Sequence, residues 1–374
     1  MSGVLARQFV AAHARGDHWA SVTKACTGRL GELPDGANLG FVYVTDALAG
    51  DLASVLTFLR ERTRIADWVG SVGLGVCAAG QEYFDEPALA VLVAALPPDS
   101  FRLFTPSRAN LAKLSQDRWF ERVRPMVGIV HGDPRDAGIG ATVATLAAEA
   151  SLFLVGGLAA SADSPVQVAG RIVEGGLSGV LLAPDIPVIT GLTQGCSPIG
   201  PIRRVTEARD NILMAIDERP ALEVFRDDIG ELLSRDLRRV AGLIFAGFPV
   251  SGSDTGDYLV RNLVGIDARQ QWLAVAHEVA PGDRVLFCRR DPASAAADLD
   301  RMLTDLKRRA NGVPRGGLYF SCVGRGPNLF GKPSRELAMI SEALGDFPLA
   351  GFFGNGEIAH DRLYGYTGAL ALFL

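Results

Sequence analysis

Short apolar runs alternate with longer amphipathic segments along most of this chain. An apolar run over Phe41–Thr45 precedes a helical pattern over Asp51–Arg62, and a glycine-bearing run over Val69–Val76 precedes another apolar run over Ala88–Ala95. Short apolar runs are typical of buried strands, whereas an apolar face that returns with each helical turn is typical of a helix. The pattern therefore predicts an α/β fold whose sheets are covered by helices.

The order strand, helix, glycine-bearing strand, outer strand returns twice further along the chain. Its spacing of about 60 residues predicts a repeat, because self-similarity at a fixed period marks repeat architectures. The copies share spacing more than residue identity, so ordinary α/β alternation is the alternative. The second and third copies are expected to comprise Met126–His131, Gly140–Ala150, Phe153–Ala159 and Leu177–Leu182, and then Gly317–Cys322, Arg335–Leu344, Leu349–Glu357 and Thr367–Phe373.

The length of 374 residues is too great for one ordinary core, so two domains are expected. The boundary is expected near Asp217–Pro220, where a strand ends and Pro220 stands in the first turn of a helix. This division gives an N-terminal helical segment over residues 1–38 and two domains of mixed or antiparallel sheet over 39–218 and 219–374. Beyond the boundary we expect a helix from Pro220 to about Arg239, strands near Ala241–Phe248, Tyr258–Asp267, Trp272–His277 and Arg284–Cys288, and a charged helix over Ser294–Arg309.

Composition and charge exclude several classes of partner. A net charge of −5 without a Lys/Arg block gives no basic field for phosphate backbones, so nucleic acid is not expected. No apolar run reaches the roughly 18 residues that a membrane helix needs, and no signal peptide is visible. Five cysteines without a CxxC pair fit a reducing compartment, so a cytoplasmic protein is expected. The five histidines show neither i,i+4 pairing nor a Cys/His cluster, so no metal site is expected.

Two glycine-rich segments resemble nucleotide-binding loops but lack essential residues. Gly326–Pro333 has the glycine and lysine spacing of a P-loop, yet Pro333 stands where the magnesium-binding Ser or Thr should be. Gly73–Ala78 lacks the third glycine of the dinucleotide-binding fingerprint. We therefore expect no cofactor.

Two loops that each carry a cysteine are the strongest chemical signals. Gln194–Pro201 and Phe320–Gly326 place Cys196 and Cys322 in tight backbone after strand-forming runs, where side chains and N–H groups can face a cavity. A thiol nucleophile needs a base and a lowered pKa, and His360 is the best candidate for that base. A thiol-dependent transferase or hydrolase is therefore one hypothesis, and an interaction scaffold without a ligand is another.

These loops occur together with further segments that resemble the FIST family, whose proteins combine a FIST N and a FIST C domain. The resemblance covers roughly Leu39 to the C-terminus. It implies a sensory module that binds a small ligand, with amino acids or related metabolites as the proposed class. It also implies signalling through a separate protein in trans, because neither an F-box nor an output module is visible in this sequence. A branch of bacterial relatives binds haem, which makes a haem-binding gas sensor an alternative. The matching segments are Val155–Gly157, Thr193–Gly200, Val205–Thr206 with Asn211, Asp217–Leu222, Phe320–Gly326 and Leu349–Ile358.

The leading hypothesis places the ligand in a cleft between the two domains, because such clefts suit small molecules. Arg325 would pair with a ligand carboxylate in bidentate fashion, the alternative being a salt bridge that closes its loop. Glu357 would receive an ammonium group or that same arginine. Backbone groups of the loop glycines would contribute hydrogen bonds, and the two cysteines would line the wall. No catalytic residue is assigned, and the expected ligand-binding residues are Gly195, Cys196, Pro198, Ser321, Cys322, Gly324, Arg325, Gly351, Phe352 and Glu357.

Overall fold

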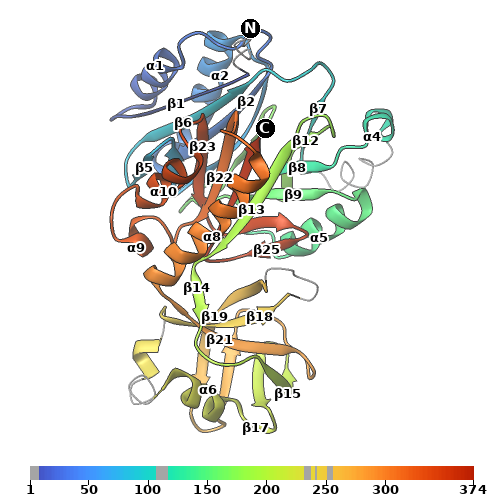
Figure 1. Ribbon diagram of the computed structural model, residues 1–374, viewed down its shortest axis with the longest axis vertical. Coiled ribbons are helices and arrows are strands. Elements are labelled where there is room, and N and C mark those ends of the chain that lie inside the picture. The colour runs from blue at the N-terminus through green and yellow to red at the C-terminus, as the bar shows by residue number, and fades with distance from the viewer. Residues whose placement is uncertain (1–7, 107–116, 231–236, 241, 251–255) are drawn as a thin grey trace. The chain divides into compact units, whose positions relative to one another are not determined.

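The computed structural model describes residues 8–106, 117–230, 237–240, 242–250 and 256–374, and it divides into two compact units (Figure 1). Unit 1 comprises the chain up to Thr193, together with residues 298–363 and 367–374. Unit 2 comprises Gln194–Ala297 and Tyr364–Tyr366. The units do not follow the sequence boundary expected near residue 218. Each unit contains residues from both sides of that boundary, because unit 2 is inserted in the sequence between the second and third repeats.

Unit 1 contains three copies of a strand–helix–strand–strand repeat with one topology. In each copy the first strand is central, the second pairs with it in parallel, and the last pairs with it antiparallel. The repeat predicted from the sequence is therefore confirmed. In chain order the copies comprise β2 Leu39–Thr45, α2 Leu52–Thr63, β3 Asp67–Gly73 and β6 Ala88–Ala94; β8 Val127–Gly132, α5 Ile139–Ala150, β9 Phe153–Leu158 and β12 Leu177–Leu182; and β22 Gly316–Cys322, α10 Arg335–Leu344, β23 Leu349–Gly354 and β26 Thr367–Phe373.

Each of the three sheets is extended by a strand from another copy. β4 (Gly75–Ala78) follows β3 in the first copy but pairs with β23 of the third. β24 (Glu357–His360) leaves the third copy and pairs with β9 of the second. β10 (Gln167–Ala169) leaves the second and pairs with β3 of the first. The exchange connects the three sheets in a ring and covers strand edges that would otherwise be open.

This exchange corrects part of the strand prediction. Val69–Val76 and Leu349–Glu357 each read as one strand in the sequence, but each divides between two sheets. The breaks fall at Gly73 and Gly354, where an added Cβ atom would lie 2.7 Å and 2.4 Å from a backbone oxygen. Apolar periodicity does not reveal which sheet a strand joins, because it records burial and not the partner strand.

One glycine recurs at the same register position in all three copies. Gly70, Gly156 and Gly351 lie on the second strand, each opposite a residue of the central strand. A Cβ atom there would lie 1.7, 1.7 and 1.8 Å, respectively, from that residue's carbonyl oxygen. No side chain fits at this distance, so the repeat requires glycine at these positions.

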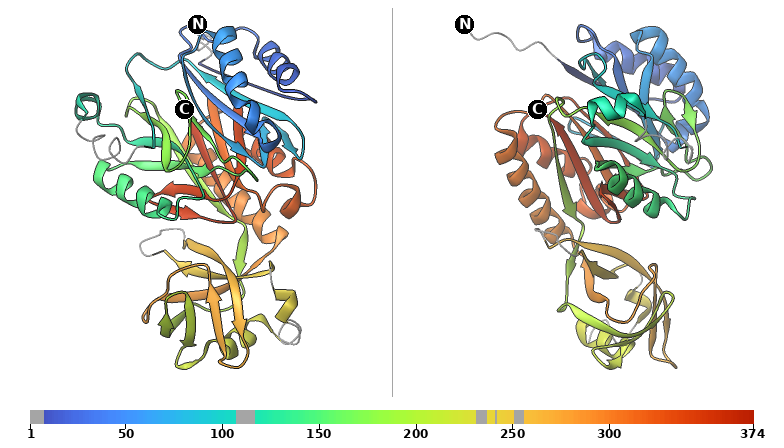
Figure 2. Two further views of the ribbon diagram at one scale, coloured as in Figure 1. Left: turned by 180° about the vertical axis from the view of Figure 1, so that it is seen from behind. Right: turned by 90° about the vertical axis from the view of Figure 1, so that its right-hand side faces the viewer.

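The three sheets share one apolar core and bury their other faces under helices. The shared core gathers side chains from every copy, such as Phe41, Ile129 and Leu318. Separate apolar clusters join the opposite face of each sheet to its helices, which Figure 2 shows on the outside of the sheets. Two helices contribute to each cluster: α1 (Trp19–Leu30) and α2, α4 (Arg118–Val123) and α5, and α8 (Pro292–Ala310) and α10.

An aromatic cluster occupies the middle of the shared core. Each recurrent glycine is paired with a residue of the central strand, and the next residue along that strand is Tyr43, His131 or Phe320. Phe352 of β23 completes the cluster. Their ring centroids lie 5.3 to 6.2 Å apart. Nε2 of His131 lies 3.2 Å from the hydroxyl oxygen of Tyr43. The three repeats thus meet through equivalent side chains.

The segment ahead of the first repeat differs from the expected helical segment over residues 1–38. A strand, β1 (Phe9–Arg15), precedes α1 and pairs antiparallel with β6. The nearly alternating burial of its side chains has the period of a strand. The remaining strands of the unit 1 sheets are β5 Gln81–Phe84, β7 Phe101–Phe104, β11 Ile172–Val173, β13 Val188–Gln194 and β25 Arg362–Tyr364.

Unit 2 is an antiparallel sheet that closes on itself. β18 pairs with β19 on one side and with β21 on the other, and β21 also pairs with β14 and β15. The resulting barrel encloses an apolar core in which the Phe225 and Phe287 rings lie 4.8 Å apart. Its elements are β14 Cys196–Pro198, β15 Arg203–Arg209, β16 Ile212–Ile216, β17 Arg219–Pro220, α6 Ala221–Ile229, β18 Ile244–Pro249, β19 Tyr258–Asp267, β20 Trp272–Val275 and β21 Arg284–Arg290.

Helix boundaries in the second half of the chain follow the sequence signals to different degrees. The helix expected from Pro220 to about Arg239 is shorter, because α6 ends at Gly230, whose φ is 77°. Residues 231–236 lie outside the described residues, and a 3₁₀ turn, η2, follows at Leu237–Val240. The charged helix expected over Ser294–Arg309 is present as α8.

Candidate functional site

The predicted ligand-binding residues divide between the two units. Gly195, Cys196 and Pro198 lie in β14 or directly before it, in unit 2. The other seven lie in unit 1, at the end of β22, in the loop after it, or on β23 and β24. Their convergence on one ligand stays a prediction.

A buried polar cluster surrounds Arg325, in the loop after β22. This side chain is fully buried, and its Nε donates to Oε1 of Glu336 over 2.7 Å. Nη2 lies 2.7 Å from the same oxygen, and the guanidinium carbon lies 5.3 Å from the centroid of the Phe330 ring. Glu336 stands in the first turn of α10 and is fully buried as well. The salt bridge that closes this loop, the alternative expected for Arg325, is present.

Glu336 gathers further donors from the strand and loop next to it. The Tyr319 hydroxyl donates to Oε1 over 2.5 Å, and the Ser321 hydroxyl and the Gly326 N–H donate to Oε2 over 3.3 Å and 3.2 Å. Several donors around one buried carboxylate offset much of its desolvation cost. Sequence reasoning missed Glu336 because an acidic residue in the first turn of a helix is ordinarily explained by the helix dipole.

Six polar side-chain atoms of unit 1 are buried without a hydrogen-bond partner among the described residues. They are Nη1 and Nη2 of Arg325, the latter still within 2.7 Å of Glu336, Oε1 of Glu357, Oγ1 of Thr193, Oε1 of Glu82 and Nδ1 of His131. Glu357 accepts from the backbone N–H and the hydroxyl of Thr367, over 3.2 Å and 2.7 Å, through its other oxygen only. An unpaired buried polar group costs about 1–3 kcal/mol, so such atoms are candidates for contact with a bound molecule.

Thr193 belongs beside this cluster, although sequence reasoning did not select it as a site residue. A Cβ atom at Gly368 would lie 2.3 Å from the Tyr319 hydroxyl oxygen and 3.1 Å from Cγ2 of Thr193. Both side chains therefore flank one glycine of β26. The only sequence signal for Thr193 was that it begins the Thr193–Gly200 segment, because a threonine in a strand is ordinary by itself.

Burial controls the electrostatics of the cluster. It raises the pKa of Glu357 to about 8, against the hydrogen bonds from Thr367 and the positive charge of Arg325. Burial also raises the pKa of Glu82 to about 7, and the negative charge of Glu336 adds to this effect. Oε2 of Glu82 accepts from the backbone N–H of Ser334 over 2.9 Å. Two carboxyl groups that interact with Glu336 therefore have pKa values close to neutral pH.

The other predicted residues of unit 1 have mainly structural surroundings. Gly351 allows the close backbone approach described above, and Phe352 is fully buried in the aromatic cluster. Cys322 ends β22, and its carbonyl oxygen accepts from the N–H of Arg325 over 2.8 Å across a tight turn that contains Gly324. This turn places the guanidinium next to the first turn of α10.

The histidines that a haem group or a thiol would need are placed unfavourably. His131 is enclosed by the rings of the aromatic cluster, and burial lowers its pKa to about 3, so haem does not fit at that imidazole. His360 has a 59% exposed side chain that stacks on Phe153 and lies 3.3 Å from Asp361. In unit 2, the side-chain partner of Cys196 is the thiol of Cys288. No group of three or more His, Cys, Asp or Glu side chains in the described part could hold a metal ion.

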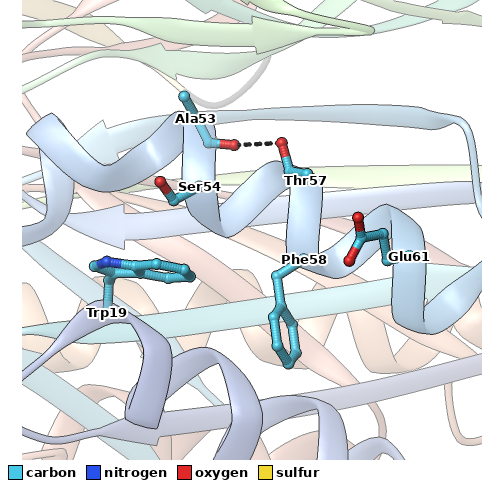
Figure 3. Close-up of a pocket in the computed structure, with 6 residues that line it drawn as sticks. All are labelled: Trp19, Ala53, Ser54, Thr57, Phe58 and Glu61. Carbon is cyan, nitrogen blue, oxygen red and sulfur yellow. Dashed lines mark hydrogen bonds between the residues drawn. The ribbon is translucent and has the colours of Figure 1, made fainter.

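Two shallow hollows lie on the surface of unit 1, and no predicted site residue lines either of them. One of about 330 Å³ lies between α1 and α2, where the rings of Trp19 and Phe58 face each other across it (Figure 3). The other, of about 650 Å³, lies at the C-terminal ends of α8 and α10. Among the helices described, none has both the length and the apolar surface needed to cross a membrane. The buried cluster, and not these hollows, is the candidate site.

Three α/β repeats around one core, a closed barrel inserted between them and a buried arginine–carboxylate cluster define a two-unit α/β protein with a polar site in its repeat unit. The chain belongs to the FIST family: its residues 38–219 match the FIST N domain and residues 221–360 match the FIST C domain. This confirms the resemblance inferred from the cysteine loops. FIST domains are associated with sensory and signal-transduction roles.

Similar full-length proteins occur in mycobacteria. The chain is 31% identical over 337 residues to an uncharacterized protein of Mycobacterium tuberculosis, covering 86% of this chain and 87% of that protein. It is 30% identical over 362 residues to an uncharacterized protein of Mycobacterium bovis, covering 88% of this chain and 92% of that protein. The similarity therefore spans both units.

Proposed function

We propose that this protein is a cytoplasmic sensory protein that binds a small carboxylate ligand, an amino acid or related metabolite, at the buried cluster of unit 1. One observation carries the proposal: Arg325 is fully buried, pairs with Glu336, and still has an Nη1 without a partner among the described residues. A guanidinium with free N–H groups suits a carboxylate, because its planar fork matches the two oxygens. The sensory association of FIST domains supports the role.

The partly satisfied carboxyl of Glu357 is the proposed partner of the ligand's amino group. Its pKa of about 8 keeps it mostly protonated at neutral pH, with Oε1 unpaired and Oε2 occupied by Thr367. A bound ammonium favours the ionised carboxylate, so an amino acid should displace a proton when it binds. A simple carboxylic acid has no ammonium and should displace none from this residue.

Thermal denaturation with a panel of amino acids and organic acids tests the proposal. A ligand at about a hundred times its Kd should add about 2.7 kcal/mol to the free energy of unfolding. Glu357→Gln keeps the size of the side chain but cannot ionise, so it should lose the response to amino acids. Arg335→Ala, which removes an exposed ion pair with Glu342 on α10, is the matched control and should keep the response. A panel without any shift for the native chain would contradict the proposal.

Calorimetry in two buffers of different ionisation enthalpy identifies the recognised group. We expect proton release near pH 7 for an amino acid, and none for the corresponding acid without its amino group. Glu357→Gln should abolish the release. Equal proton exchange for both ligands would show that Glu357 does not receive the amino group.

We propose further that the bound state is recognised by a separate signalling protein. A ligand changes such an interaction only as far as its affinity differs between the two states of the protein. Co-purification with a candidate partner, with and without the ligand found in the panel, should differ for the native chain. It should not differ for Glu357→Gln.

A further inference from the structure

Two cysteines of unit 2 form a thiol pair on the outer face of the barrel. β14 and β21 are antiparallel neighbours in which Cys196 is opposite Arg290 and Pro198 is opposite Cys288. Residues two apart on a strand share a face, so Cys196 and Cys288 are diagonal neighbours on one face of the sheet. The thiol of Cys288 forms a side-chain hydrogen bond with Cys196.

The face that carries the thiols is opposite to the barrel core. Along β21, Val285 and Phe287 belong to the core, whereas Leu286 and Cys288 belong to a separate cluster. The cluster is completed by Cys196, Phe245, Tyr258 and Val260, with Tyr366 packed against it. The thiols therefore lie in an apolar cluster on the face of the sheet opposite the barrel core, and Cys196 retains 4% exposure.

We propose that Cys196 and Cys288 are a redox-active dithiol that hydroperoxides oxidise to a disulfide. Cys196 is the attacking residue, because it is the more exposed of the pair and lies in the three-residue edge strand β14. Cys288 is the resolving residue, fully buried on the neighbouring strand, with its sulfur also 3.7 Å from the carbonyl oxygen of Phe245. This proposal stands apart from the ligand site of unit 1.

Cys288 is protonated in the resting protein. The interaction with Cys196, followed by burial, raises the pKa of the Cys288 thiol. Cys288 therefore keeps its proton until a sulfenic acid has formed on Cys196.

The chemistry balances in two steps. The Cys196 thiolate attacks one oxygen of the hydroperoxide, so that an S–O bond forms, the O–O bond breaks, and the leaving oxygen takes up a proton as water or alcohol. The Cys288 sulfur then attacks the sulfenic sulfur, so that the S–S bond forms, the S–O bond breaks, and water leaves with the Cys288 proton. Two thiols are oxidised and one hydroperoxide is reduced.

The bond would tie together both ends of the inserted unit. Cys196 lies just after the chain enters unit 2, and Cys288 lies shortly before it leaves. Diagonal sheet neighbours lie about 7–8 Å apart, beyond the Cα separation that a disulfide spans, so β14 must move towards its partner strand for the bond to form. As an edge strand of three residues it has few bonds to lose.

The test uses the full chain, hydrogen peroxide, alkylation of remaining thiols under denaturing conditions, and peptide mapping by mass spectrometry without reductant. We expect one linked peptide pair containing Cys196 and Cys288, and restoration of both thiols by dithiothreitol. Cys322→Ala, which removes another buried thiol, should leave the linkage unchanged. Cys288→Ala should leave Cys196 as a sulfenic acid that dimedone traps, and Cys196→Ala should prevent both products.

Other outcomes would overturn the proposal. One is stepwise over-oxidation of Cys196 while Cys288 of the native chain stays open to alkylation. Another is that peroxide leaves both thiols unoxidised, so that both are alkylated without any reductant. Circular dichroism of each variant separates a lost reaction from a lost fold.

Discussion

The two units of this protein differ in the charged groups that they bury. Among the described residues, unit 1 buries His131, Asp133, Arg325, Glu336 and Glu357, whereas unit 2 buries Gln194 and holds a nearly buried ion pair, in which the side chains of Arg203 and Asp228 are 18% and 5% exposed. A buried charge costs stability unless it is well paired, and an apolar replacement is often as stable. Both oxygens of Asp228 accept from Arg203, whereas Nη1 of Arg325 and Oε1 of Glu357 have no hydrogen-bond partner among the described residues. The charges in unit 1 therefore point to a use in binding, which is the basis of the proposed function.

The units also differ in how they cover the edges of their sheets. The barrel closes through a pairing of β18 with β21, in which Gly247 is opposite Leu286 and an added Cβ atom would first meet the Leu286 side chain, at 2.7 Å. The repeat unit exchanges strands and brings parallel neighbours so close that one position in each copy must be glycine. Unit 1 should accordingly tolerate substitution at strand glycines much less than unit 2.

The largest effect is expected from glycine substitution in the repeat. Gly156→Ala places a Cβ atom 1.7 Å from the carbonyl oxygen of Val130, so we expect a loss of more than about 4 kcal/mol in the free energy of unfolding, or no folded protein. Gly265→Ala on β19 of unit 2 meets its nearest atom at 3.5 Å and should change stability by less than about 1 kcal/mol. Urea denaturation followed by circular dichroism measures both.

A second control keeps this test specific for the strand position. Gly140→Ala, in helix α5 of the same copy as Gly156, meets no atom within 4 Å and should stabilise the helix by roughly 0.5–1 kcal/mol. A mild effect of Gly156→Ala would contradict the close approach of β8 and β9.

Removal of one partner from the buried ion pair should have the next largest effect. Arg325→Met leaves Glu336 buried without its guanidinium, so we expect a loss of about 3–5 kcal/mol. Arg335→Ala, in the exposed pair with Glu342, should cost about 0–1 kcal/mol. Hydrogen-exchange mass spectrometry should place the loss in peptides of unit 1. Equal losses of stability in Arg325→Met and Arg335→Ala would show that burial does not determine how much the Arg325–Glu336 pair contributes.

Acid should weaken unit 1 through His131. Its pKa is about 3 in the folded protein, against an ordinary value near 6.5, so the unfolded chain binds the extra proton between these values. Stability is full above pH 6.5 and falls by about 1.4 kcal/mol for each pH unit below it, which gives about 2 kcal/mol at pH 5. Urea denaturation above pH 6.5 and at pH 5 should show that His131→Phe removes this loss.

The matched histidine of unit 2 sharpens this comparison. Burial also lowers the pKa of His277, which is only partly buried, so His277→Phe should change the pH dependence less than His131→Phe does. An acid loss of equal size in both variants would contradict the contrast between the units.

Glu357 is expected to show the opposite pH dependence. Its folded pKa of about 8 lies above the ordinary value near 4.5, so the folded protein holds a proton that the unfolded chain has released. The contribution is fully present below pH 4.5 and is lost as pH rises through 8, at about 1.3 kcal/mol per pH unit between pH 5 and 7. Glu357→Gln should flatten this part of the stability profile. A profile that is unchanged in the variant would assign the slope to another group.

Much of the fold could be read from local patterns because those patterns record burial and backbone geometry. The strand expected over Tyr258–Asp267 is β19, with the same bounds. Arg325 was selected from the sequence as a ligand contact, with a salt bridge that closes its loop as the alternative, and that salt bridge is present. Its partner Glu336 was not found, because a helix start and a distant loop come together only in the folded chain.

The sequence by itself determined the three repeats, the family and the loop that carries Arg325, since each of these depends on residues close together along the chain. Only the tertiary structure decided which strands change sheets, that the inserted segment closes into a barrel, and which polar atoms are buried without a partner. These depend on pairings between distant segments. A one-dimensional pattern of apolar and polar positions fixes which face of a strand is buried, but not the strand beside it.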